Sequence, residues 1–130
     1  ICNMGVDFFI VSEGAYNHDG SFTIVNTFDI LKADKFPFKT NLGVSLKLSF
    51  NKNSVWEKNF KLKLYKIEDN QELYNLGGNM PEIQEDEGKL AMAANVQGLV
   101  IPSAGKYKMI LFLGETPKAE YYFKVVENGK

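Results

Sequence analysis

Residues 99–113 read Leu-Val-Ile-Pro-Ser-Ala-Gly-Lys-Tyr-Lys-Met-Ile-Leu-Phe-Leu, and this stretch decides the fold. Pro102 has no N–H to give to a sheet, and Gly105 adopts backbone angles closed to other residues, so a turn is expected between them. After the turn, apolar side chains recur at every second position and share one face of a strand: Tyr107, Met109, Leu111 and Leu113. A strand with so much bulk on one face needs a second layer to bury it.

Other short segments of the chain show the same period of two, and none shows a sustained helical period. Strands are therefore expected at residues 6–11, 22–31, 43–50, 60–64, 72–76, 90–96 and 119–125. Asp19-Gly20, between the first two of these, is a strong hairpin signal. About eight strands separated by regular turn signals predict an all-β, antiparallel two-sheet β-sandwich, with residues 1–130 forming a single domain.

The composition excludes some classes of partner. The chain of 130 residues is 45% hydrophobic and 13% aromatic, which is enough for a packed core. Fifteen basic and sixteen acidic residues give a net charge of -1, without the basic excess of a nucleic-acid-binding protein. Every basic residue is lysine, so no guanidinium is present to grip phosphate or guanine in a bidentate way. Nucleic acid is not an expected partner.

The single cysteine, Cys2, excludes an intrachain disulfide and makes the cytoplasm the expected location. Because the chain begins at Ile1 and not at Met, a cleaved signal peptide remains compatible with the sequence. No apolar run approaches the roughly 20 residues that span a bilayer, so no membrane association is expected.

Several motifs resemble an uncharacterised family of small bacterial β-sandwich domains with an immunoglobulin-like fold. They are Asn26-Thr27-Phe28-Asp29-Ile30, Phe36-Pro37, Phe60-x-Leu62-x-Leu64 and Leu99-x-Ile101-Pro102-x-x-Gly105-x-Tyr107. The resemblance covers nearly the whole chain in order, and it implies a fold without an activity. A single cysteine departs from antibody-type domains, which have a disulfide between their sheets.

No group of residues predicts catalysis. His18 is the only histidine, it is expected in a turn, and no nucleophile lies near it in the sequence. The strongest metal candidate is an acidic cluster without calcium-loop spacing, which is interpreted as a solvated loop: Glu82, Glu85, Asp86 and Glu87. The sequence therefore predicts a protein that is not an enzyme and has no metal site and no cofactor.

Two apolar surfaces exceed what the core needs. Ile110 and Phe112 lie on the face opposite Tyr107, and residues 6–11 are apolar on both faces, which adds Phe8 and Ile10. Either the chain's own N-terminal hairpin or a second copy covers such a surface. These four residues are the candidate interface of a non-catalytic protein-interaction module, whose partner is another protein or a second copy in a homodimer.

The alternative hypothesis is a carbohydrate-binding sandwich. Trp56, Tyr16, Tyr74 and Tyr122 fall where the alternation pattern makes no demand on the core, and exposed rings of this kind stack on sugars. Trp56, Tyr16 and Tyr74 are the candidate ligand platform. A third feature is a set of lysines expected to line one outer sheet face: Lys47, Lys61 and Lys63. They fit either the site of an acidic partner or an ordinary solvated face.

Overall fold

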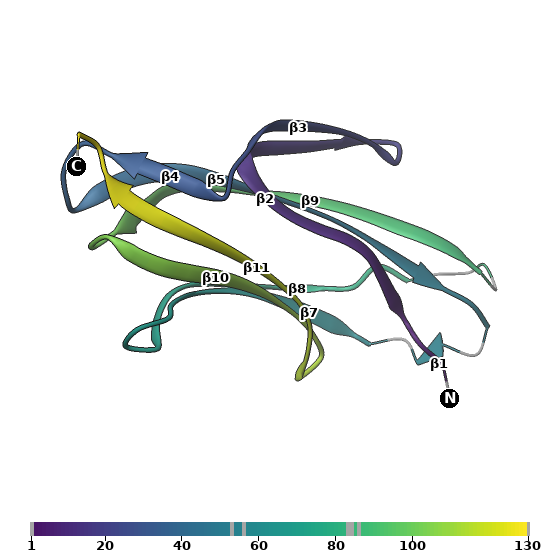
Figure 1. Ribbon diagram of the computed structural model, residues 1–130. Coiled ribbons are helices and arrows are strands. Elements are labelled where there is room, and N and C mark those ends of the chain that lie inside the picture. Colours follow the sequence, from purple (N-terminus) through teal and green to yellow (C-terminus); the bar gives the residue numbers. More distant parts are fainter. Residues whose placement is uncertain (1, 53, 56, 83–84, 86, 130) are drawn as a thin grey trace.

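The computed structural model describes residues 2–52, 54–55, 57–82, 85 and 87–129, and every regular element in them is a strand (Figure 1). The strands are β1 (Cys2–Asn3), β2 (Gly5–His18), β3 (Ser21–Thr27), β4 (Ile30–Ala33), β5 (Phe38–Phe50), β6 (Ser54–Val55), β7 (Asn59–Lys66), β8 (Gln71–Asn79), β9 (Gly88–Ile101), β10 (Gly105–Leu113) and β11 (Thr116–Glu127). Among these residues, no helix has the length and apolar character needed to cross a membrane.

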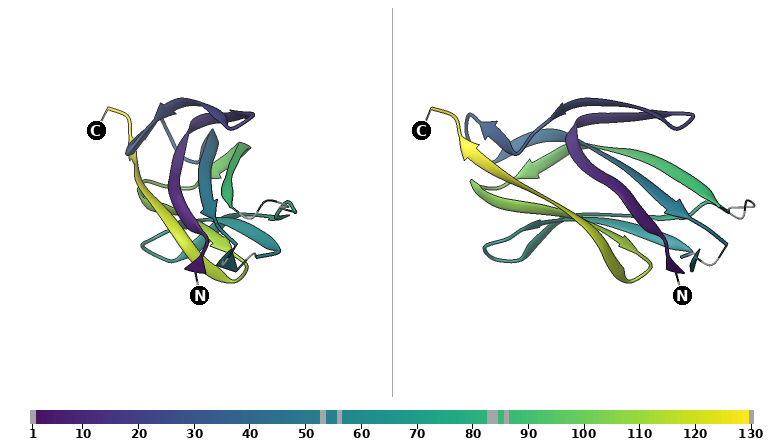
Figure 2. Two further views of the ribbon diagram at one scale, coloured as in Figure 1. Left: turned by 90° about the vertical axis from the view of Figure 1, so that its right-hand side faces the viewer. Right: turned by 45° about the vertical axis from the view of Figure 1, so that its right-hand side comes forward.

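Two sheets lie face to face (Figures 1 and 2). A five-stranded sheet has the order β4-β11-β10-β7-β8, and a four-stranded sheet has the order β3-β2-β5-β9. In the described residues the two sheets together hold nine strands, and β1 and β6 add a short parallel pair. The predicted all-β, two-sheet sandwich is confirmed, with one strand more in its sheets than the sequence suggested.

β10 is the middle strand of the five-stranded sheet, and its alternation is the predicted one. Its inward side chains are at most 1% exposed: Tyr107, Met109, Leu111 and Leu113. They belong to the same core as the inward side chains of β5, which are at most 2% exposed: Leu42, Val44, Leu46 and Leu48. Full burial of an aliphatic side chain stabilises a fold by about 1.5–3 kcal/mol, so these two strands carry much of the hydrophobic free energy.

Tyr107 fixes the corner between β9 and β10. Its ring is fully buried and stacks on Phe123 of β11 with 5.7 Å between ring centroids, and its hydroxyl donates to the carbonyl oxygen of Ser103. Burial also raises the pKa of Tyr107. A tyrosine that closes this corner with a backbone hydrogen bond is a hallmark of immunoglobulin-like sandwiches, and the chain crosses between the sheets several times, as it does in that fold. The fold is immunoglobulin-like.

The hairpin predicted at Asp19-Gly20 is confirmed. Asp19 has a φ of 52° and Gly20 a φ of 86°, which is the requirement of a type I′ turn. β2 and β3 pair in antiparallel fashion on either side of the turn.

Part-way along its length, β2 exchanges its pairing with β5 for pairing with β3 alone. Its first half pairs with β5 and its second half pairs with β3. At the change, Gly14 passes so close to Gly43 of β5 that a Cβ on Gly43 would lie 2.4 Å from the Gly14 carbonyl carbon. Gly43 alternates with the core residues Leu42 and Val44, so this crossing is on the outer side of the four-stranded sheet. Residues 12–27, the outer hairpin, therefore form a partial third layer there (Figure 2).

Two asparagine side chains fasten the outer hairpin to β9. The Asn95 amide accepts from the Ala15 N–H at 3.1 Å and donates to the Ala15 carbonyl oxygen at 2.7 Å, as a neighbouring strand would. Asn17 Nδ2 donates to the Ala91 carbonyl oxygen at 3.1 Å. These bonds satisfy backbone groups that would otherwise depend on water.

The structure corrects the single strand predicted over residues 22–31. β3 ends at Thr27 in the four-stranded sheet, and β4 begins at Ile30 in the other sheet, where it runs parallel to β11. Asn26 has a φ of 50°, in the left-handed region, so the side-chain alternation does not continue through it. As a result, Ile30 is 53% exposed and does not share the buried face of Phe22.

Replacing Gly43 with alanine tests the crossing. The added Cβ meets backbone atoms that cannot rotate away, so Gly43→Ala is expected to lower the free energy of unfolding by at least about 2 kcal/mol. Gly5→Ala is the matched control, because its Cβ would meet nothing nearer than 3.9 Å, and a change within about 0.5 kcal/mol is expected. Urea unfolding measures both. Equal stabilities of the two variants would contradict a hairpin seated on Gly43.

Candidate interaction surface

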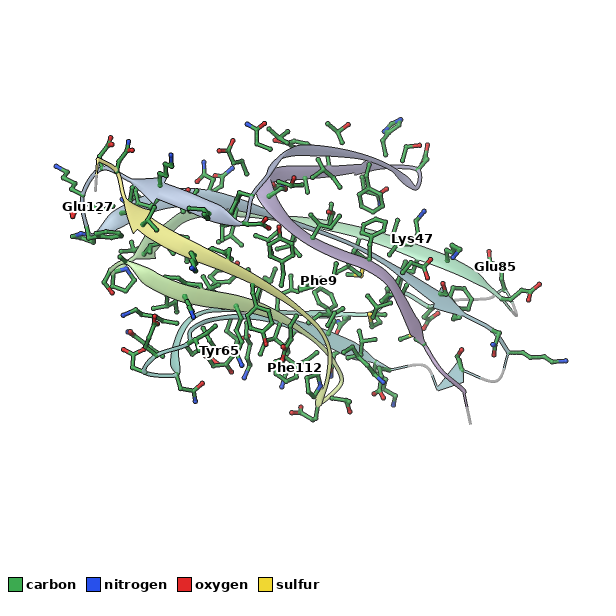
Figure 3. The ribbon with its side chains drawn as sticks, in the orientation of Figure 1. Phe9, Lys47, Tyr65, Glu85, Phe112 and Glu127 are labelled. Atoms are coloured by element: carbon green, nitrogen blue, oxygen red, sulfur yellow. The ribbon has the colours of Figure 1, made fainter. Side chains whose placement is uncertain are left out.

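The outer face of the five-stranded sheet is the candidate interaction surface, and we call it the open face. Figures 1 and 2 show no described strand lying across it. In Figure 3, Tyr65 and Phe112 lie on this outer side, whereas Phe9 lies between the sheets. The outward-pointing residues that define the open face are Ile30, Lys32, Lys61, Lys63, Tyr65, Glu72, Lys106, Lys108, Ile110, Phe112, Glu120, Tyr122 and Lys124.

Two of the predicted interface residues, Ile110 and Phe112, lie near the middle of the open face. The expectation of surplus exposure is wrong for Ile110, which is only 7% exposed. In the sheet register Ile110 stands between Lys63 of β7 and Glu120 of β11, and long side chains of this kind cover apolar neighbours with their stems. Phe112 is half-buried, and Lys63 Nζ lies 5.5 Å from the centroid of its ring.

Lysines outnumber carboxylates on the open face. Lys61 Nζ is 3.0 Å from Glu115 Oε1 in the turn after β10, and Lys63 Nζ is 3.3 Å from Glu72 Oε1. The hydrogen bond from Lys63 to Glu72 raises the pKa of Lys63. The remaining lysines of this face have no ion pair with a described residue: Lys32, Lys106, Lys108 and Lys124.

The remaining carboxylate of the open face, Glu120, is bound to a neutral group. The Tyr122 hydroxyl donates to Glu120, and this hydrogen bond raises the pKa of Tyr122. Among the described residues, no carboxylate forms an ion pair with Lys106, Lys108 or Lys124, although Glu68 interacts electrostatically with Lys106.

A groove of about 360 Å³ indents one end of the open face. Its lining is mostly apolar, and three of its side chains are large and exposed: Ile30 at 53%, Ile67 at 36% and Tyr122 at 56%. The charged residues of the lining are Lys106, Lys124 and Asp29.

The turn between β7 and β8 forms one side of the groove, where Ile67 is part of the lining. The Glu68 carboxylate of that turn accepts the Lys106 backbone N–H at 3.0 Å, and this bond lowers the pKa of Glu68. Ile67 N–H donates to the Lys106 carbonyl oxygen at 2.9 Å. Because both residues of the turn are bonded to the start of β10, the Ile67 side of the groove is fixed to the sheet.

The other two predicted interface residues, Phe8 and Ile10, lie on the outer face of the four-stranded sheet. Phe8 contacts Phe22 of β3 edge-to-face, with 5.1 Å between centroids, so the chain's own N-terminal hairpin contacts this surface. Both residues are half-buried. The fold therefore does not bring them together with Ile110 and Phe112, which belong to the other sheet.

The residues of the predicted ligand platform are not gathered in one place. Tyr16 lies on the outer hairpin with 59% of its surface exposed. The expectation that Tyr74 plays no part in the core is wrong, because it is half-buried and packs on the core from β8. A bulge at Leu64 and Tyr65 lets Leu73 and Tyr74 both reach the core. Trp56 lies outside the described residues.

Sequence reasoning missed Ile30 and Ile67 as surface residues. Ile67 is out of phase with the apolar positions of residues 60–64 and precedes the turn-forming Glu68, a signal that it has no place in the core. Ile30 carried no such signal, because its change of face follows from the backbone angle at Asn26. The prediction that three lysines line one sheet face is wrong for Lys47, because β5 belongs to the four-stranded sheet, while Lys61 and Lys63 lie on the open face.

No group of three or more histidine, cysteine or acidic side chains is placed to hold a metal ion among the residues that the structure describes. Asp86 of the predicted acidic cluster is outside that part of the chain.

A model of a family of unknown function (DUF6941) matches residues 7–126. The chain belongs to this family. That agrees with the resemblance to an uncharacterised family, and the function of the family is unknown. A search of curated proteins finds no significant match.

Among solved structures, the chain is similar to an immunoglobulin-like protein from Pseudomonas aeruginosa. The sequence identity is 14%, the TM-score is 0.48, and the match covers 96% of this chain and 98% of that one.

Serine substitutions at Ile110 and Tyr122 test whether the first residue is buried and the second is exposed, through their effects on the free energy of unfolding. Ile110→Ser removes a buried apolar side chain and buries a hydroxyl, so the free energy of unfolding should fall by about 2–3 kcal/mol. Tyr122→Ser changes a largely exposed residue and should stay within about 0.5 kcal/mol of the wild type. Urea unfolding followed by circular dichroism measures both values. A small effect of Ile110→Ser would show that its cover of long side chains is absent in solution.

Proposed function

We propose that the protein is a non-catalytic interaction module that binds an acidic protein partner through the open face. The observation that carries the proposal is the combination of an apolar groove with unpaired lysines on one uncovered sheet face. The function belongs to the site and does not follow from an immunoglobulin-like fold, which serves many purposes.

The groove supplies the apolar part of such an interface. Ile30, Ile67 and Tyr122 are exposed together, and tyrosine is among the residues that anchor protein interfaces. The backbone bonds between the β7–β8 turn and Lys106 keep this site preformed, so a partner would not have to order it.

The lysines supply specificity. Lys106, Lys108 and Lys124 are close to the groove, and none has an ion pair with a described residue. An acidic partner would gain complementary charge here, and a basic partner would be repelled. Flexible lysines also suit a protein surface better than a site for planar, bidentate recognition of carboxylate or phosphate.

Carbohydrate binding has less support from the geometry. Tyr16 and Tyr74 belong to different sheets, and Tyr74 faces the core, so the two rings form no common platform.

Charge reversal on the open face tests the proposal. A Lys106→Glu, Lys108→Glu, Lys124→Glu variant should bind its acidic partner at least about tenfold more weakly, because attraction becomes repulsion. The measurement is affinity capture from a lysate of the source cell, followed by titration of the captured protein at two salt concentrations. Higher salt should weaken wild-type binding.

The matched control changes the same net charge elsewhere. Lys35→Glu, Lys39→Glu, Lys52→Glu alters three exposed lysines outside the open face and should leave binding unchanged. Circular dichroism checks that both triple variants are folded. Equal capture of an acidic partner by both variants, or capture of a basic one, would sink the proposal.

A further inference from the structure

β3 is an edge strand, and in the described residues it pairs with β2 on one side and with no strand on the other. Its seven residues, Ser21–Thr27, read Ser-Phe-Thr-Ile-Val-Asn-Thr and include no charge, no proline and no glycine. Phe22 packs on Phe8, which holds the strand against the sheet. Thr23 and Val25 face away from the sheet, and Val25 is 39% exposed.

A strand of this kind offers a row of backbone N–H and C=O groups to another strand. Natural proteins shield such edges by shortening them, by placing lysine or proline on them, by twisting them with bulges, or by covering them. Asn26, with its φ of 50°, interrupts only the last part of β3 and leaves residues 21–25 as a regular, uncharged edge of high β-propensity.

The other edges of the sandwich have the protection that β3 lacks. β4 has four residues and carries Lys32. β8 carries Glu72 and has two glycines, Gly77 and Gly78, before its last residue. β9 lies under the outer hairpin, where Asn17 already donates to the Ala91 carbonyl oxygen and the Asn95 side chain is bonded to Ala15. Among the described edge strands, β3 is therefore the one without a charged residue, a glycine or a register shift against its neighbour.

We propose that β3 joins two copies of this chain by antiparallel pairing about a twofold axis. An antiparallel pair of identical strands is self-complementary, as an isologous interface requires. The register that pairs all seven residues of β3 places Thr23 opposite Val25 of the other copy, and the register centred on residues 21–25 places Thr23 opposite Thr23; both keep Phe22 and Ile24 on the same side. β-Branched residues opposite one another stabilise such a pair, and no like charges meet within the strand.

The proposed dimer is independent of the open face. β3 belongs to the outer hairpin on the four-stranded sheet, whereas the groove and its lysines belong to the five-stranded sheet. A dimer formed at β3 would therefore carry two open faces, each free to bind its own partner, and failure of either proposal leaves the other intact.

The experiment is sedimentation velocity of the full chain over a concentration series up to about 1 mM. This range detects even a weak dimer, with a dissociation constant of about 1 mM. The wild type should form a dimer, and amides of β3 should be protected from hydrogen exchange more strongly at high concentration than at low. Thr23→Lys, Val25→Lys places lysine opposite lysine in either register. This double variant should have a dimer dissociation constant about tenfold higher than that of the wild type, or more.

A charge-swapped mixture tests the strand pairing directly. Thr23→Glu, Val25→Glu should be monomeric alone, and an equimolar mixture with the lysine variant should form a heterodimer, since lysine then faces glutamate in either register. Val100→Lys is the control, because Val100 is 47% exposed on β9, and its dimer should match that of the wild type.

A wild type that stays monomeric over the whole series overturns the proposal. So does a dimer that the lysine variant leaves unchanged, because that dimer forms elsewhere on the molecule. A monomeric wild type whose β3 variant loses a captured foreign protein also overturns it, and would assign this edge to an extended segment of another chain.

Discussion

The passage of Gly14 over Gly43 is the contact on which the outer layers of the molecule depend. Two backbones meet there without side chains between them. The second half of β2 can therefore cross over β5 and pair with β3 in the outer hairpin. The amide of Asn95 then takes the place of a neighbouring strand for Ala15. As a result the sandwich has two unlike outer faces, one partly covered by its own chain and one open.

The charge of the open face comes from the separation of residues by strand alternation. Apolar residues fill most inward positions of β7, β10 and β11, so the lysines that alternate with them point outward: Lys61, Lys63, Lys106, Lys108 and Lys124. Several carboxylates fall instead in the turns, as Glu68 and Glu115 do. A chain with a net charge of -1 can thus present a locally basic sheet face beside an apolar groove.

The sequence was enough to predict what depends on local chemistry. Alternation placed Tyr107 and its neighbours in β10 inside the core, and Asp19-Gly20 marked the hairpin. The positions of Ile30 and Tyr74 were out of reach, since they depend on a left-handed Asn26 and on a bulge between β7 and β8. The groove could not be predicted either, because it needs β4 beside β11, a pairing between distant parts of the chain.

That parallel pairing has a consequence for how the protein is made. β4 is near the start of the chain, and β11, the last strand of the sandwich, lies between it and the central strand β10. The Tyr121 hydroxyl of β11 donates a hydrogen bond to the carbonyl oxygen of Phe28, just before β4, and so also joins these two parts of the chain. On the ribosome β4 has no neighbour until β11 emerges, so the five-stranded sheet closes late and through contacts of long sequence separation, which fold slowly.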